Sequence, residues 1–168
     1  VRADGSALPF EKTEGPTAVR TVLERLAERH GWSKESEYEG GPCIALKRGR
    51  ASITLEPGAQ LEISGSPLDT LHETSLELLG HAAELRAVSD DLGIAWLGLG
   101  FHPFATREEL PWVPKLRYAV MREYLPTRGK YALDMMLRTC TIQSNLDYAN
   151  VDDAFQKLRI GLRLQPIV

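Results

Sequence analysis

The sequence predicts an α+β fold in which helices cover one face of an antiparallel sheet and the other face is polar. Two observations support the sheet: residues 43–64 alternate apolar and polar side chains around two turn signals, and residues 138–148 divide sharply into two faces. A third supports the helices, because residues 16–30 and 66–92 carry apolar side chains at helical spacing. With 168 residues the chain can bury a core of its own, and we expect residues 1–168 to form a single domain.

Residues 51–64 are typical of a β-hairpin around a Pro-Gly turn. A three-residue loop at 57–59 pairs Leu55 with Leu61, and the apolar residues of both arms then share one face. A two-residue loop would place Glu56 opposite an alanine and mix the two faces. The alternation therefore selects the three-residue loop and gathers polar side chains on the opposite face: Glu56 paired with Gln60, and Glu62.

A further strand is expected just before the hairpin. Residues 43–48 have strand character, and Gly49-Arg50 can form a two-residue turn into the next strand. This register pairs Leu46 with Ile53, which continues the apolar face of the hairpin. Residues 43–64 are therefore predicted to form a three-stranded meander with one buried face.

Four helices are expected, at residues 16–30, 66–92, 114–126 and from 151 onward. Gly31 and Gly93 follow the first two and are good C-terminal stops. Ser66, which precedes a proline, and Asn150 are suitable N-cap residues. The apolar stripes of the second and fourth helices predict packing against the core, without implying a cofactor.

Two more strands are predicted, a mostly apolar central one at residues 94–101 and one at residues 138–148. The second has a wholly polar face, which includes Gln143 and Asn145. We expect this face to continue the polar face of the hairpin.

Composition and charge exclude several classes of protein. The net charge is −3 without a basic cluster, which argues against a nucleic-acid partner. The longest apolar run, about eight residues, is far too short to cross a membrane, and no secretion signal is visible. Cys43 and Cys140 form no zinc-type pattern, so two reduced thiols in a cytoplasmic protein are expected. The sequence leaves the oligomeric state open.

The polar face has the ligand chemistry of a magnesium site. Carboxylate and amide oxygens are donors that Mg²⁺ accepts, and this ion retains waters and substrate phosphates in its shell. Nearby arginines could bind a phosphate or carboxylate in bidentate fashion. A solvated sheet face explains the same polar residues. The residues concerned are Glu56, Gln60, Glu62, Gln143 and Asn145, with Arg117, Arg138 and Arg159.

Three ordered motifs give the sequence a family resemblance. They are SITLEPGAQLEISG at 52–65, PKLRYAVMREYLP at 114–126 and LDMMLRTCTIQSNLDY at 133–148. From about residue 39 to the end, the chain resembles glutamate–cysteine ligase of the plant and proteobacterial type. Three long motifs in the same order are far more specific than any one of them.

The resemblance implies a glutamine-synthetase-like catalytic sheet and a reaction of three small substrates: ATP, L-glutamate and L-cysteine. ATP would phosphorylate the γ-carboxylate of glutamate, and the amine of cysteine would displace the phosphate. This is the first step of glutathione biosynthesis. The resemblance also implies roles for six residues: Glu56 and Glu62 as Mg²⁺ ligands, Gln143 and Asn145 facing the nucleotide, and Arg117 and Arg138 binding substrate or phosphate.

The chain departs from the family in sequence and in length. Leu116 and Ala119 replace a usual Gly and Asp beside Arg117, and Ser75 stands where plant members carry a regulatory cysteine. Family members are also two to three times as long, so we expect an internal part of the catalytic domain that is inactive alone. Two alternatives remain: a related ATP-dependent carboxylate–amine ligase with another acceptor, and a non-catalytic binding or structural domain.

Overall fold

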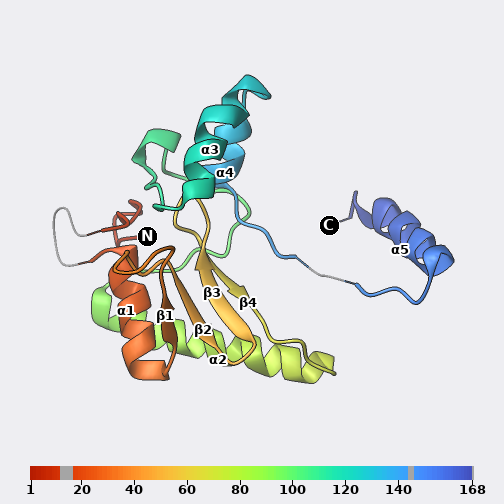
Figure 1. Ribbon diagram of the computed structural model, residues 1–168, viewed down its shortest axis with the longest axis horizontal. Helices are drawn as coiled ribbons and strands as arrows, with labels where there is room; N and C mark the ends of the chain where they lie inside the picture. Colours follow the sequence, from red (N-terminus) through yellow and green to blue (C-terminus); the bar gives the residue numbers. More distant parts are fainter. Residues whose placement is uncertain (12–16, 144–145, 168) are drawn as a thin grey trace.

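A four-stranded antiparallel sheet forms the centre of the fold (Figure 1). The computed structural model describes residues 1–11, 17–143 and 146–167. The strands follow one another across the sheet in chain order. They are β1 (Ser33–Glu35), β2 (Ala45–Arg48), β3 (Ala51–Leu55) and β4 (Leu61–Ser64). The expected α+β class with an antiparallel sheet is confirmed.

The hairpin has the predicted register. Leu55 lies opposite Leu61, and Leu46 lies opposite Ile53 in the neighbouring pair of strands. The loop has three residues, because the Glu56 amide donates to the Gln60 carbonyl at 2.9 Å. Ala59 takes the left-handed conformation, with φ of 60°, which is the usual way for a three-residue hairpin loop to close. Ile53 and Leu55 are consequently fully buried while Glu56 stays on the opposite face.

Strand β1 is an element that the sequence did not predict. Its three residues, Ser33, Lys34 and Glu35, are all exposed and show no apolar alternation. Main-chain pairing with β2 defines this strand, and Lys34 lies opposite Leu46. A strand held by backbone hydrogen bonds alone leaves no pattern in its side chains.

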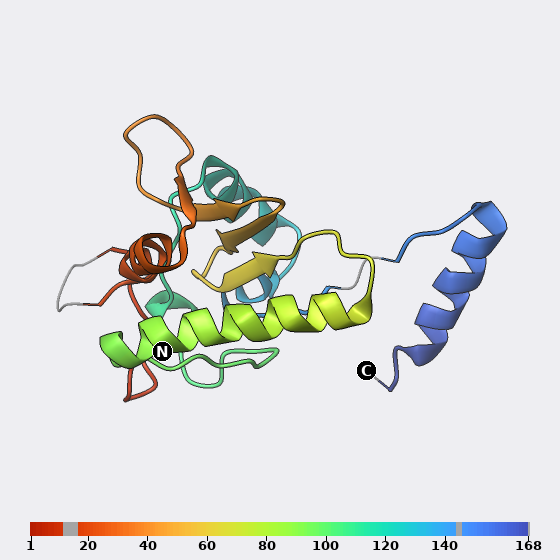
Figure 2. The ribbon, with the colours of Figure 1, turned by 90° about the horizontal axis from the view of Figure 1, so that it is seen from below.

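Helices α1 (Val19–His30) and α2 (Leu71–Leu92) cover the apolar face of the sheet (Figure 2). Helix α1 buries Val22, Leu23 and Leu26 completely and ends as predicted at Gly31, where φ is 70°. Helix α2 runs along the sheet and contributes Val88 to the same core. The predicted placement of helices on one face of the sheet is therefore confirmed.

The predicted start of α2 at Ser66 is wrong by several residues. Thr70 caps the helix in a reciprocal capping box with Glu73, which satisfies two backbone N–H groups at once. The Ser66 amide instead donates to the carboxylate of Glu77, at 2.9 and 3.1 Å. Only the C-terminal part of the stripe is in the core, since Leu71 is 85% exposed.

In the described residues, no strand is formed within the predicted ranges 94–101 and 138–148. Residues 132–138 form helix α4 (Ala132–Arg138), because Leu-Asp-Met-Met-Leu-Arg is a run of mostly good helix formers. The first segment contains two flexible glycines and keeps one bridge at each end, Arg2 to Ile94 and Phe101 to Thr139. The two segments therefore touch at one point rather than along a ladder. Asn145 lies outside the described residues.

The remaining helices lie at and beyond one end of the sheet. Helix α3 (Leu116–Tyr124) continues into the 3₁₀ turn η2 (Leu125–Thr127), and a further turn η1 (Arg107–Glu109) packs against α4. These elements surround a second, smaller apolar cluster that includes Met136 and Leu137.

Helix α5 (Val151–Leu164) begins where the sequence predicts, with the Asn150 side chain accepting from the Asp153 amide at 3.0 Å. The helix lies apart from the sheet (Figure 1), and none of its residues is buried. Phe155, for example, is 61% exposed. The predicted packing of its apolar stripe against the core is therefore wrong for the described part of the chain.

In residues 1–11, 17–143 and 146–167, none of the helices is long and apolar enough to cross a membrane.

A polar network joins α1, β2 and α2, and Arg48 of β2 donates to the carbonyl of His30, the last residue of α1, at 2.9 Å. Glu84 of α2 accepts hydrogen bonds from Trp32 Nε1 at 2.9 Å and Arg48 at 2.8 Å. Burial alone would raise the pKa of Glu84, but the hydrogen bonds from Arg48 and Trp32 outweigh it and lower the pKa. One helical turn earlier, His81 is buried, and this burial lowers the pKa of its imidazole.

His81 makes stability depend on pH. Because its pKa is lower in the folded state than the usual value of about 6.5, the unfolded chain binds the proton more readily. The contribution of neutral His81 to stability is complete above pH 6.5 and is lost as the pH drops through and below that value. The charge of Arg48 favours the neutral form of His81, whereas Glu77 and Glu84 favour the protonated form.

We expect His81→Gln to reduce the loss of Tm between pH 7.5 and 5.5, measured by circular dichroism. His72→Gln, at an exposed position of the same helix, is the control and should leave the loss unchanged.

Candidate functional site

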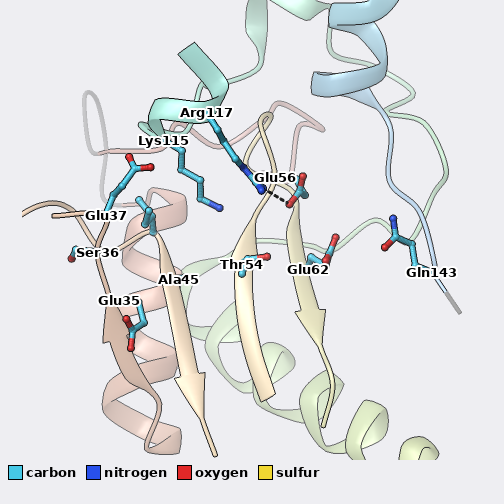
Figure 3. Close-up of a pocket in the computed structure, with 11 residues that line it drawn as sticks. Glu35, Ser36, Glu37, Ala45, Thr54, Glu56, Glu62, Lys115, Arg117 and Gln143 are labelled. Atoms are coloured by element: carbon cyan, nitrogen blue, oxygen red, sulfur yellow. Dashed lines mark ion pairs between the residues drawn. The ribbon is translucent and has the colours of Figure 1, made fainter. Parts of the chain in front are cut away.

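The open face of the sheet and the start of α3 border an open cavity of about 610 Å³ (Figure 3). Alternate residues of the strands point into it, since Thr54 lies opposite Glu62 and Glu56 follows two positions after Thr54. The side chains that line the cavity are those of Glu35, Ser36, Glu37, Ile44, Ala45, Thr54, Glu56, Glu62, Lys115, Arg117 and Gln143.

Four of the six residues singled out from the sequence meet at this cavity. Glu56 and Glu62 come from the hairpin, Arg117 from the first turn of α3, and Gln143 from the segment after α4. These positions are up to 87 residues apart in the chain, from 56 to 143. The sequence therefore identified side chains that share one cavity, although Gln143 reaches it from a loop rather than from a strand.

One of the six residues, Arg138, does not line the cavity. The Arg138 guanidinium is 3.3 Å from Asp134 and stacks over the Phe101 ring at 4.3 Å, outside the lining of the cavity. Asn145 lies outside the described residues. Arg159, named as a further cation, is on α5 and does not line the cavity. The binding roles of Arg138 and Asn145 stay predictions.

Gln60 also differs from expectation. Its side chain does not line the cavity but donates from Nε2 to the carbonyls of Leu137 at 2.8 Å and Thr139 at 3.1 Å. The backbone alternates as predicted, and the long side chain reaches the end of α4 instead of turning to the carboxylates.

Arg117 is held in the cavity by its neighbours. Its guanidinium donates to the Tyr118 hydroxyl at 2.8 Å and lies 3.6 Å from a carboxylate oxygen of Glu56 (Figure 3). The hydrogen bond with Tyr118 raises the pKa of Arg117, so this group stays charged. Because the ion pair with Glu56 is long and largely exposed, it stabilises the fold little and leaves the guanidinium free to bind an anion.

Lys115 is a site residue that the sequence interpretation missed. Its Nζ donates to the Leu55 carbonyl at 2.7 Å, and Tyr118 donates to the same carbonyl at 2.9 Å. Burial, and then the charge of Arg117, lower the pKa of Lys115. The available signal was its position in the Pro-Lys-Leu-Arg run, two residues before Arg117, where the chain enters a helix.

The charges in the cavity are divided between two sides. Lys115 and Arg117 supply the cations of one side at the start of α3, where Glu35 and Glu37 also lie, and Glu37 accepts a hydrogen bond from the Leu116 amide at 2.9 Å. Glu62 and Gln143 form the other side, with Glu56 between the two (Figure 3). A negatively charged group can thus meet arginine and lysine while a cation meets carboxylates.

The donors fit a magnesium ion that is only partly coordinated by protein. In residues 1–11, 17–143 and 146–167, no three carboxylate, imidazole or thiolate groups gather closely enough to hold a metal on their own. Glu56, Glu62 and Gln143 supply oxygen donors around one cavity. Mg²⁺ is usually bound by one or two carboxylates together with waters and substrate phosphates, and Glu56 and Glu62 supply two carboxylates here.

Comparison with known proteins adds an independent observation. The chain is 49% identical over 149 residues to the chloroplastic glutamate–cysteine ligase of Brassica juncea, and the match covers 89% of this chain and 29% of that protein. The corresponding ligase of Arabidopsis thaliana is also 49% identical, and ligase A of Oryza sativa subsp. japonica is 48% identical. The chain therefore spans less than a third of the length of the curated relatives it matches.

The family comparison covers almost the whole chain. The model of glutamate–cysteine ligase family 2 matches residues 6–168, a range that includes every residue lining the cavity. The chain belongs to glutamate–cysteine ligase family 2.

Proposed function

We propose that this chain is part of the catalytic domain of an enzyme that uses ATP to join the γ-carboxylate of L-glutamate to the amino group of L-cysteine. One observation carries the proposal: a single cavity gathers side chains from all three sequence motifs. Glu56 and Glu62 come from the first, Lys115 and Arg117 from the second, and Gln143 from the third. The product, γ-glutamylcysteine, is the precursor of glutathione.

The reaction needs two displacements. An oxygen of the glutamate γ-carboxylate attacks the γ-phosphorus of ATP, and ADP leaves. The cysteine nitrogen then attacks the resulting acyl carbon, inorganic phosphate leaves, and the nitrogen loses a proton. Both steps bring several negative charges together, so the protein contributes mainly by positioning and by offsetting charge.

The two sides of the cavity suit these demands. Lys115 and Arg117 would bind the negatively charged oxygens of a phosphate or carboxylate. Glu56 and Glu62, with Gln143 beside them, would hold Mg²⁺, which when bound neutralises phosphate charge. The Tyr118 hydroxyl keeps the Arg117 guanidinium oriented, so little reorganisation is needed when an anion arrives.

The 168 residues alone should not turn over substrate. The 149 residues that match the Brassica juncea relative cover 29% of its length, and we propose that other parts of the protein complete the site. Incubation of the chain with ATP, Mg²⁺, glutamate and cysteine should release no ADP above the blank. Steady turnover by this chain would show that the described cavity suffices.

Glu62→Gln should lower the activity of the full-length enzyme by at least tenfold while changing its Tm little. The substitution keeps the shape of the side chain and removes a charge that would bind Mg²⁺. Phosphate release should be measured over a range of Mg²⁺ concentrations, with Glu28→Gln at an exposed position of α1 as the control. If Glu62→Gln kept the full rate at limiting Mg²⁺, Glu62 would not be a metal ligand.

Lys115→Gln should lower kcat/KM by roughly tenfold, about the effect of one lost charge-assisted hydrogen bond. The neutral amide can still donate to a carbonyl but cannot offset the charge of a bound anion. Lys130→Gln, at an exposed lysine outside the cavity, is the matched control. Equal kinetics for both variants would remove Lys115 from the site.

The choice of acceptor can be tested in the same assay. Phosphate release should depend on cysteine and be slower with other amino acids at equal concentration. Equal or faster release with another amine would favour the related ligase that uses a different acceptor. Absence of both Mg²⁺–ATP binding and phosphate release in the full-length protein would instead favour a non-catalytic domain.

A further inference from the structure

Gln60 lies where the hairpin meets the end of α4. Its Nε2 donates to the carbonyls of Leu137 at 2.8 Å and Thr139 at 3.1 Å, with the Met136 carbonyl at 3.4 Å. The last carbonyls of a helix have no partner within the helix and need an external donor. Thr139, the C-cap, is extended with φ of −99° and ψ of 145°, so no left-handed residue closes the helix. The Gln60 side chain, which belongs to the hairpin and not to α4, supplies the donor for these carbonyls.

A second contact fixes the same end of the helix. A Cβ atom added to Gly58 would lie 2.3 Å from the Leu137 carbonyl oxygen, which is far inside van der Waals contact. The hairpin loop therefore approaches the backbone of α4 more closely than any side chain at position 58 would permit. Gly58 and Gln60 together seat the hairpin against one carbonyl group.

This contact sets the course of the segment that leads into the cavity. Immediately after α4, the Cys140 amide donates to the Gly100 carbonyl at 3.1 Å, and the His102 amide donates to the Arg138 carbonyl at 2.8 Å. The chain then reaches Gln143, which lines the cavity with Glu56 and Glu62. The segment that leaves α4 is therefore fixed by hydrogen bonds from two directions: from the Gln60 side chain, and from the backbone of residues 100–102.

We propose that Gln60 is a positioning residue, which locks the end of α4 to the hairpin and so places Gln143 opposite Glu56 and Glu62. The consequence for binding rests on the proposed function, whereas the contact itself does not. Gln60 lies between the two carboxylates in sequence but acts through the segment at 137–143. Its amide must present nitrogen to the three carbonyls, because oxygen there would face three acceptors.

The kinetic test uses the full-length enzyme with Gln60→Met, which keeps the length of the side chain and removes both donors. The concentration of Mg²⁺–ATP needed for half-maximal rate should rise roughly 10- to 100-fold, the usual effect of losing a group that orients ligands. Tm should remain close to that of the control variant Gln156→Met, at an exposed position of α5. Gly58→Ala should raise the same requirement by displacing the Leu137 carbonyl. An unchanged requirement in Gln60→Met would overturn the proposal.

Gln60→Glu tests the same contact through its dependence on pH. A carboxylate would repel the three carbonyls, whereas the protonated acid can donate to one of them. The variant should be more impaired than Gln60→Met at pH 8 and approach or exceed its activity at pH 6. A constant ratio between the two variants across this range would contradict the proposed contact.

An independent measurement separates this proposal from the proposed function. Hydrogen exchange of the Cys140 and His102 amides should be faster in Gln60→Met than in the unaltered chain, whether or not the protein has ligase activity. Unchanged exchange would exclude the positioning role even in an active ligase. Faster exchange in a protein that releases no phosphate would support the contact and reject the ligase function.

Discussion

The pairing register of β3 and β4 decides which face of the sheet is apolar and which carries the carboxylates. Side chains alternate along a strand, so a slip of β4 by one residue would bring Glu62 to the helices and Ile63 to the open face of the sheet. The three-residue loop prevents that slip, because the Glu56 amide and the Gln60 carbonyl close it in a single arrangement. Burial of Ile53 and Leu55 under α1 and α2 stabilises the same register. The core and the cavity thus depend on one constraint.

The Leu55 carbonyl then joins the sheet to α3. Leu55 is the last residue of β3, and its carbonyl oxygen accepts hydrogen bonds from Lys115 and Tyr118. The apolar ring of Tyr118 belongs to the main core while its hydroxyl orients Arg117. The cations of the cavity are therefore positioned by the strand that Glu56, with its nearby carboxylate, directly follows. This arrangement explains how residues so far apart in the sequence come to face one another.

Local patterns predicted part of this fold well. The hairpin register follows from alternation, and the end of α1 at Gly31 follows from the need for a left-handed residue. Residues 138–148 misled the interpretation, because in their described part the alternation of polar and apolar side chains accompanies the end of α4 and a segment that pairs only at the bridge of Thr139 to Phe101. Their polar face was a sound guide to Gln143 but not to a strand. Alternation of polar and apolar residues indicates which side chains could share a face. Whether a segment forms a strand also depends on a partner strand elsewhere in the chain, which the alternation does not reveal.

The site could be predicted only as far as the motifs identify residues. Glu56, Glu62, Arg117 and Gln143 were found because charged or amide side chains in those motifs have an evident chemistry. Lys115 was missed because its role depends on the distance to a carbonyl 60 residues away, which no spacing rule reveals. Gln60 was assigned to the wrong surroundings for the same reason, since its partners are main-chain carbonyls at positions 137 and 139.

The glycine at the tip of the hairpin has a consequence for how this family can vary. Gly58 is not among the residues with positive φ, so the turn itself would accept many amino acids there. The restriction comes from a neighbouring helix, whose carbonyl occupies the space of a side chain. A mutational scan would find a strict glycine requirement that turn preferences do not explain. Homologues with a larger residue at this position should carry a compensating change at the end of the equivalent helix.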